Sequence, residues 1–189
     1  MQATQELRNE HEGIKIALAV LNHMADEIEE GRNVDLDDVE QLVDFLKTFA
    51  DRCHHGKEES LLFPALEKMG VAKEGGPIGV MLTEHCHGRE YIRAMSDALC
   101  GLFEGDKDAR TAFALAAHGY AALLNRHIVK ENTVLFPMAD QILLQDEQIR
   151  LKEGFDRIEQ ERIGPGVHER YHALLDHLRE KYLEKSKAA

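Results

Sequence analysis

Apolar residues recur every three or four positions along most of the chain, which is the spacing of one face of an α-helix. No segment alternates apolar and polar residues in the manner of a half-buried β-strand. Glycine, proline and capping residues punctuate the pattern and place the helix ends. The predicted helices cover about residues 4–30, 35–68, 78–102, 108–143, 146–163 and 167–183. The sequence therefore predicts an all-α protein.

The connections between the first four predicted helices are short, which favours neighbours that run in opposite directions. We expect residues 1–143 to form an antiparallel up-and-down four-helix bundle, and residues 144–189 to form a C-terminal helical extension. Pro64 and Pro137 fall inside the second and fourth helices, where a kink or local break is expected. An apolar stripe on the last helix predicts that the extension packs on the bundle or forms a homodimer interface. The stripe consists of His168, Tyr171, Leu175, Leu178 and Tyr182.

An internal repeat occupies the first four helices. Residues 54–64 and 127–137 share the pattern HxxKExxxLFP, displaced by 73 positions, and a Glu-His pair precedes each copy at Glu10-His11 and Glu84-His85. Each predicted hairpin therefore carries EH on its first helix and HxxKE on its second. A pattern that occurs twice in this order indicates two pseudo-symmetric hairpins that face each other.

Histidine and glutamate side chains of the repeat line up with the apolar faces of the helices. In both HxxKE copies the histidine and the glutamate are four residues apart, so they lie on one helix face within reach of a common ion. Burying such groups unpaired costs several kcal/mol each, and a shared metal ion removes that cost. Imidazole with carboxylate suits iron, zinc or manganese. The predicted ligands are His11, His54, Glu58, His85, His127 and Glu131.

The remaining candidates lie away from these faces at helical spacing. We interpret His23, His87, His118 and Glu59 as solvated. His55 is a candidate for an additional ligand, because a kink near Gly56 would turn it inward, and His168 is a weaker candidate.

Composition narrows the class of protein further. The chain has 189 residues, eleven histidines and a net charge of −12, a balance that disfavours binding to nucleic acid or to an anionic membrane. Cys53, Cys86 and Cys100 form no CxxC motif and no paired framework. The N-terminus lacks the apolar core of a signal peptide, and no segment is apolar enough to span a bilayer. We therefore expect a cytoplasmic protein.

The doubled order EH, HxxKExxxLFP over about residues 7–139 resembles the hemerythrin-like HHE cation-binding domain. The resemblance implies an antiparallel four-helix bundle that holds a non-haem centre of two iron ions. It also implies four imidazole ligands and two bridging carboxylates, Glu58 and Glu131. The imidazole ligands would be His11, His54, His85 and His127.

Two departures from oxygen-carrying hemerythrins bear on function. Their second histidine on the third helix is replaced by Arg89, and the HxxxxD ending is replaced by HxxxE at His127 and Glu131. The HxxxE ending is similar to bacterial hemerythrin-like proteins linked to nitric oxide, iron–sulfur repair or sensing. The leading interpretation is a di-iron protein that binds or senses O₂ or NO. The alternatives are a di-iron enzyme (a peroxidase, an NO reductase or an iron–sulfur repair protein) and an interaction module stabilised by metal.

Overall fold

The computed structural model describes residues 2–162, 164 and 166–184, without the side chain of His168. All regular structure within these residues is helical, which confirms the all-α prediction. The α-helices are α1 (Ala3–Glu29), α2 (Leu36–Phe45), α3 (Phe63–Lys68), α4 (Pro77–Glu104), α5 (Lys107–Lys130), α6 (Phe136–Ile142), α7 (Gln145–Arg162) and α8 (Val167–Arg179). Wider π-helical segments continue several of them: η1 (Leu46–His55), η2 (Glu58–Leu62), η3 (Glu131–Leu135) and η4 (Glu180–Glu184).

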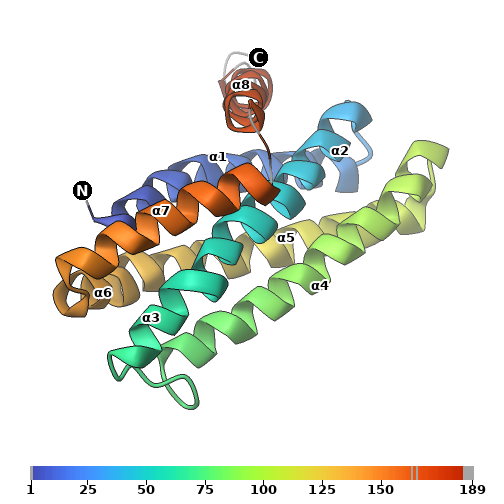
Figure 1. The fold of residues 1–189 in the computed structure, drawn as a ribbon. Helices are drawn as coiled ribbons and strands as arrows, with labels where there is room; N and C mark the ends of the chain where they lie inside the picture. Colours follow the sequence, from blue (N-terminus) through green and yellow to red (C-terminus); the bar gives the residue numbers. More distant parts are fainter. Residues whose placement is uncertain (1, 163, 165, 185–189) are drawn as a thin grey trace.

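Long helical rods lie side by side in the first three quarters of the chain. Figure 1 shows α1, the rod from α2 to α3, α4 and the rod from α5 to α6, with successive rods running in opposite directions. The turn between α4 and α5 follows from two residues. Gly105 ends α4 with a φ of 77°, and the Asp106 side chain accepts a hydrogen bond of 3.0 Å from the Asp108 backbone N–H at the start of α5.

The two prolines produce π-helical segments. Pro64 and Pro137 lack the N–H that an α-helix needs at an interior position. The preceding residues widen into η2 and η3, each of which ends one residue before a Phe-Pro pair. The expected disturbance is therefore present in both halves of the repeat, as a local change of helix type. Such π-helical turns occur often at functional sites.

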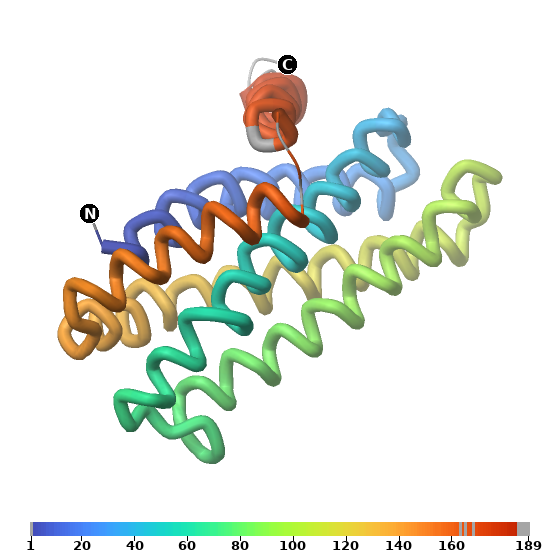
Figure 2. The backbone as a smooth tube through the Cα atoms, in the orientation of Figure 1, coloured from blue at the N-terminus to red at the C-terminus, as the bar shows by residue number. Residues whose placement is uncertain are grey.

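The C-terminal helices pack on the chain itself. Helix α7 contacts α1, η1 and η2, whereas α8 contacts α1. Figure 2 views α8 almost along its axis and shows that it lies on the outer side of the first two rods. The predicted apolar stripe lies against α1 and α2. Its described members, Tyr171, Leu175, Leu178 and Tyr182, are buried in the same cluster as residues of those helices. The candidate ligand His168 falls outside the described side chains.

The core consists of two apolar clusters with a polar layer between them. The larger cluster includes Ile14, Ile92 and Leu124, and the smaller one includes Leu7 and Met81. The buried His11 and His85 lie between these positions on α1 and α4. The layer is thus fixed from both sides by close-packed side chains. Among the described residues, no helix is both long and apolar enough to cross a bilayer.

Candidate metal centre

Five imidazoles and two carboxylates meet in the polar layer. All of them are buried, and they come from each of the rods described above. They are His11 on α1, His54 and His55 on η1, Glu58 on η2, His85 on α4, His127 on α5 and Glu131 on η3. The structure thus brings together all six residues that the sequence predicted, and it adds His55.

These side chains form two groups whose ligand atoms lie within 4.8 Å of one another. The first group, hereafter the His11–His54 group, consists of His11, His54, Glu58 and Glu131. The second, hereafter the His85–His127 group, consists of His55, Glu58, His85 and His127. Glu58 belongs to both groups, so the two candidate ion positions are adjacent.

Each glutamate directs one carboxylate oxygen to either side. Glu131 lies 3.2 Å from His11 Nε2 through one oxygen and 3.3 Å from His127 Nε2 through the other. Glu58 lies 3.7 Å from His54 Nε2 and 3.5 Å from His85 Nε2, again through different oxygens. A carboxylate in this position can bridge two cations.

Each imidazole turns its Nδ1 toward an oxygen acceptor and its Nε2 inward. The acceptor is a close carboxylate for three of the rings, a neutral amide oxygen for His11 and a more distant carboxylate for His55. The Nδ1 atoms of His54, His85 and His127 lie 2.7, 2.7 and 2.9 Å from carboxylate oxygens. The three carboxylates are those of Glu10, Glu59 and Glu84. His11 Nδ1 lies 3.0 Å from the Asn132 side-chain oxygen, and His55 Nδ1 lies 3.4 Å from Asp51. A proton held on Nδ1 leaves the Nε2 lone pair free to coordinate a metal ion.

Several buried atoms at the centre have no hydrogen-bond partner, and this observation tests whether a metal ion fits. Both carboxylate oxygens of Glu58 and of Glu131 are unpartnered, as is His55 Nε2. The Nε2 atoms also face each other in pairs, at 3.0 Å between His11 and His54 and at 3.1 Å between His85 and His127. Buried acceptors without donors are costly, and cations placed among them would satisfy all of these atoms at once. The residues present therefore fit a pair of cations.

The pKa values reflect the same excess of acceptors. Burial lowers the pKa of His54 to about 4 despite its hydrogen bond to Glu10. Burial and the charge of Glu131 raise the pKa of Glu58 well above its ordinary value. Burial also acts to lower the pKa of His127, but the nearby charges of Glu131 and Glu84 and the hydrogen bond to Glu84 outweigh it and raise that pKa to about 9. A proton on His127 thus supplies part of the positive charge that a metal ion would supply.

Comparison with known proteins identifies the family. The family model for the hemerythrin HHE cation-binding domain matches residues 2–139. The chain belongs to this family. It is also similar to an uncharacterized protein of Mycobacterium bovis and to uncharacterized proteins of two strains of Mycobacterium tuberculosis, each 24% identical over 162 residues. The match covers 86% of this chain but only 63% of the length of each relative. No solved structure matches the chain.

The geometry explains why this hemerythrin-like chain repeats EH together with HxxKE. Glu10 accepts from His54 and from Lys57, whereas Glu84 accepts from His127 and from Lys130. In each hairpin the glutamate of EH thus holds the histidine and the lysine of HxxKE on the next rod. In the sequence, Glu10 and Glu84 stand out only as members of the repeat. Their role was detectable in principle, because the motifs must meet when the rods of a hairpin pair.

His55 enters the centre because η1 is a π-helix. An α-helix advances about 100° per residue, which would turn His55 away from the face of His54. In the structure the His55 ring stacks on the His85 ring with 3.9 Å between centroids, and both His54 and His55 are buried. Both residues end the π-helical segment Leu46–His55, in which successive side chains diverge by a smaller angle than in an α-helix.

Glu59 was interpreted as solvated, and this prediction was wrong. Its carboxylate lies 2.7 Å from His85 Nδ1 and accepts a 2.6 Å hydrogen bond from Arg89. Arg89 also donates to Asp51 at 2.8 Å. Arg89 therefore holds the two carboxylates that face His55 and His85.

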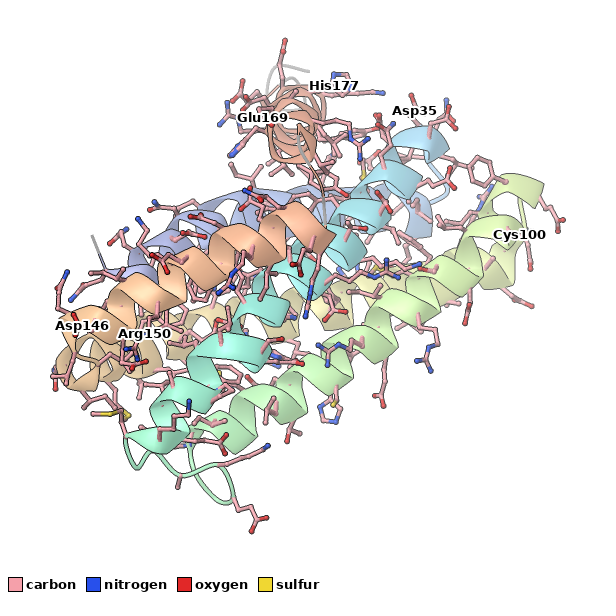
Figure 3. All side chains as sticks on the ribbon, in the orientation of Figure 1. Asp35, Cys100, Asp146, Arg150, Glu169 and His177 are labelled. Atoms are coloured by element: carbon pink, nitrogen blue, oxygen red, sulfur yellow. The ribbon has the colours of Figure 1, made fainter. Side chains whose placement is uncertain are left out.

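The histidines that were predicted to be solvated lie outside the two ligand groups. His87 is exposed, His118 is partly exposed beside Asn22, and the His23 ring lies 6.1 Å from that of Tyr182. Cys100 projects from α4 near its C-terminal end (Figure 3), and Cys86 is likewise exposed. Cys53 is buried, which raises the pKa of its thiol to about 12 and leaves it protonated.

Proposed function

We propose that this hemerythrin-like domain holds two non-haem iron ions and binds or senses a small diatomic ligand, O₂ or NO. The observation that carries the proposal is the pair of ligand groups that share Glu58 and leave both oxygens of Glu58 and Glu131 unpartnered. His11 and His54 would hold one ion, and His55, His85 and His127 the other. Glu58 and Glu131 would bridge them. Within this proposal, residues 1–143 form an antiparallel up-and-down four-helix bundle and residues 144–189 its extension.

The donor set favours redox-active iron over a structural ion. A structural zinc site is typically closed by four ligands, often thiolates. Here the candidate ligands are nitrogen and oxygen atoms. Two cysteines are adjacent to them in sequence: Cys53 has a protonated thiol, and Cys86 is exposed. When bound, a pair of iron ions would supply a redox-active centre. A diatomic molecule could coordinate to this centre and exchange charge with it.

The chain's own residues prepare the site in three ways. The acceptors on Nδ1 fix the ring orientations, so that the Nε2 atoms converge without further rearrangement. The two apolar clusters exclude bulk water, which strengthens electrostatic interactions at the centre. The groups are also unequal: the His11–His54 group contributes fewer imidazoles than the other. We therefore expect the external ligand to bind on the His11–His54 side.

The test begins with metal content and an optical spectrum of protein purified without oxygen and then exposed to air. We expect about two iron ions per chain and near-ultraviolet bands that appear on oxidation. Reduced protein should then bind O₂ or NO stoichiometrically without rapid consumption. Sustained consumption of peroxide or NO would instead favour the alternative function, a di-iron peroxidase or NO reductase. A single iron ion, stoichiometric zinc, or no metal after reconstitution would contradict the proposed centre.

A further inference from the structure

The two halves of the repeat have the same chemistry but different surroundings. The Lys57 and Glu10 side chains are 0% and 4% exposed, whereas Lys130 and Glu84 are 39% and 16% exposed. The cover over the first pair is α7, which lies outside residues 2–139 that match the family. The ring of Phe155 on α7 lies 5.8 Å from Lys57 Nζ.

Helix α7 also contributes a charge to the buried pair. Glu159 accepts from Lys57 Nζ at 3.2 Å, Lys57 donates to Glu10 at 2.5 Å, and Glu10 lies 2.7 Å from His54 Nδ1. Glu6 is a further acceptor for Lys57, at 2.8 Å. A lysine ammonium has three N–H donors, and here each faces its own carboxylate. Lys57 is thus held in one position, and it fixes the Glu10 carboxylate that orients His54.

We propose that Glu159 is a positioning residue for the His11–His54 group and acts on His54 through Lys57 and Glu10. This inference rests on the proposed metal centre. Through this chain of hydrogen bonds the C-terminal extension strengthens metal binding in one half of the centre. The other half has only the more exposed pair of Glu84 and Lys130. The two ion positions therefore differ in how firmly their ligands are held, although the sequence repeats them.

The expected effect of removing the Glu159 charge is selective. Losing an outer hydrogen-bond partner of a metal-binding histidine typically lowers metal affinity about 10- to 100-fold. Glu159 lies two contacts further out than Glu10, so we expect release of one ion to be faster by about threefold to tenfold. Release of the other ion should be unchanged.

The experiment compares the wild-type chain with Glu159→Gln, both loaded anaerobically with Fe²⁺ and then mixed with excess chelator. The two iron ions should be released to the chelator in two kinetic phases, one for each ligand group. His54→Ala and His55→Ala assign these phases, because each variant removes a ligand from one group only. Asp156→Asn is the matched control: Asp156 lies on the same helix and lines the same cavity of about 280 Å³, but no ion pair described in the structure joins it to Lys57. We expect Glu159→Gln to accelerate only the phase assigned to His54, and Asp156→Asn to accelerate neither.

Other outcomes separate the possible failures. Equal acceleration of both phases, or none, in Glu159→Gln would overturn the positioning role. Partial recovery of slow release in Glu159→Asp, with thermal unfolding of the metal-free variants unchanged, would distinguish positioning from general destabilisation. If the wild-type chain binds fewer than two ions, the proposed function itself fails, whatever the variants do.

Discussion

Glu58 and Glu131 face each other across the centre with their carboxylate oxygens divided between two groups of imidazoles. Two carboxylates this close cannot both ionise freely. The pKa of Glu58 is accordingly raised by burial and by Glu131. The pKa of Glu131 is held well below its usual range, because the nearby imidazoles of His127 and His11 outweigh its burial. Metal ions would replace this unequal sharing of charge.

Substituting either bridging residue tests that arrangement. We expect Glu58→Ala and Glu131→Ala each to lose both metal ions, since each carboxylate serves two positions. The measurement is metal content per chain by elemental analysis after anaerobic reconstitution. His23→Ala is the control and should keep its full metal content. A bridging variant that retains both ions would contradict the shared role, and a His23 variant that loses metal would contradict the assigned face of α1.

The metal-free chain should be most stable near pH 6.5. Burial lowers the pKa of His54 to about 4 and also lowers the pKa values of His55 and His85 below 6.5. Because the unfolded chain takes up these protons first, the free energy of unfolding falls as the pH drops below 6.5. The raised pKa of Glu58 acts in the opposite direction, but it is a single group, whereas three histidines lower the free energy of unfolding at acidic pH. Above pH 6.5, stabilisation from His127 is lost as the pH rises through about 9.

Urea denaturation of chelator-treated protein over a series of pH values measures this profile. The His54 contribution alone corresponds to about 3 kcal/mol between its unfolded and folded pKa values. Stability that continued to rise from pH 6.5 to pH 9 would show that His127 is not protonated in the folded, metal-free chain.

At the scale of helices, the π-helical segments and the α4–α5 hairpin position the ligands. Helix α4 carries His85 and α5 carries His127, so the spacing of these two rods sets the 3.1 Å separation of their Nε2 atoms. Their close approach near the turn depends on a missing side chain. A Cβ added at Gly101 would lie 2.5 Å from the Cβ of Ala109. Neither atom could swing aside, because both are attached directly to the backbone.

Gly101→Ala should therefore destabilise the protein despite the better helix propensity of alanine. Propensity favours alanine by about 1 kcal/mol, whereas overpacking costs about 1–3 kcal/mol. The net effect expected is a loss of roughly 1 kcal/mol, measured by thermal unfolding. Cys100→Ala, at an exposed neighbouring position, should change stability by less than about 0.5 kcal/mol. A stabilised Gly101→Ala variant would show that the two helices can separate at little cost.

At the scale of the whole molecule, the C-terminal helices share a core with the rods around the centre. Leu178 is fully buried in the cluster that also contains α1, α2 and α5 residues, and Phe155 of α7 is fully buried in the cluster on the other side of the polar layer. The extension thus covers the outside of the fold over both clusters. We expect it to unfold together with the metal centre.

Leu178→Ala tests that cooperation. Removing a fully buried leucine side chain costs about 2–5 kcal/mol, and we expect a single transition at lower temperature in which helix content and bound metal are lost together. Leu144→Ala is the control because Leu144 is 69% exposed. Two separate transitions, with metal retained after the first, would show that the extension is an independent unit.

The sequence by itself determined the helical class, the helix ends and the six side chains that come together in the polar layer. Apolar spacing, capping residues and the doubled EH and HxxKE motifs are local properties, and they sufficed to predict His11, His54, Glu58, His85, His127 and Glu131 as neighbours. Only the tertiary structure decided three further points. The π-helix η1 turns His55 inward, Glu59 pairs with His85 across two rods, and Glu159 reaches Lys57 from the last part of the chain. The inward turn of His55 departs from the regular helical period, so periodicity could not predict it. The pairs Glu59–His85 and Glu159–Lys57 join residues far apart along the chain. No sequence pattern relates such residues, so only the packing of the helices could place them together.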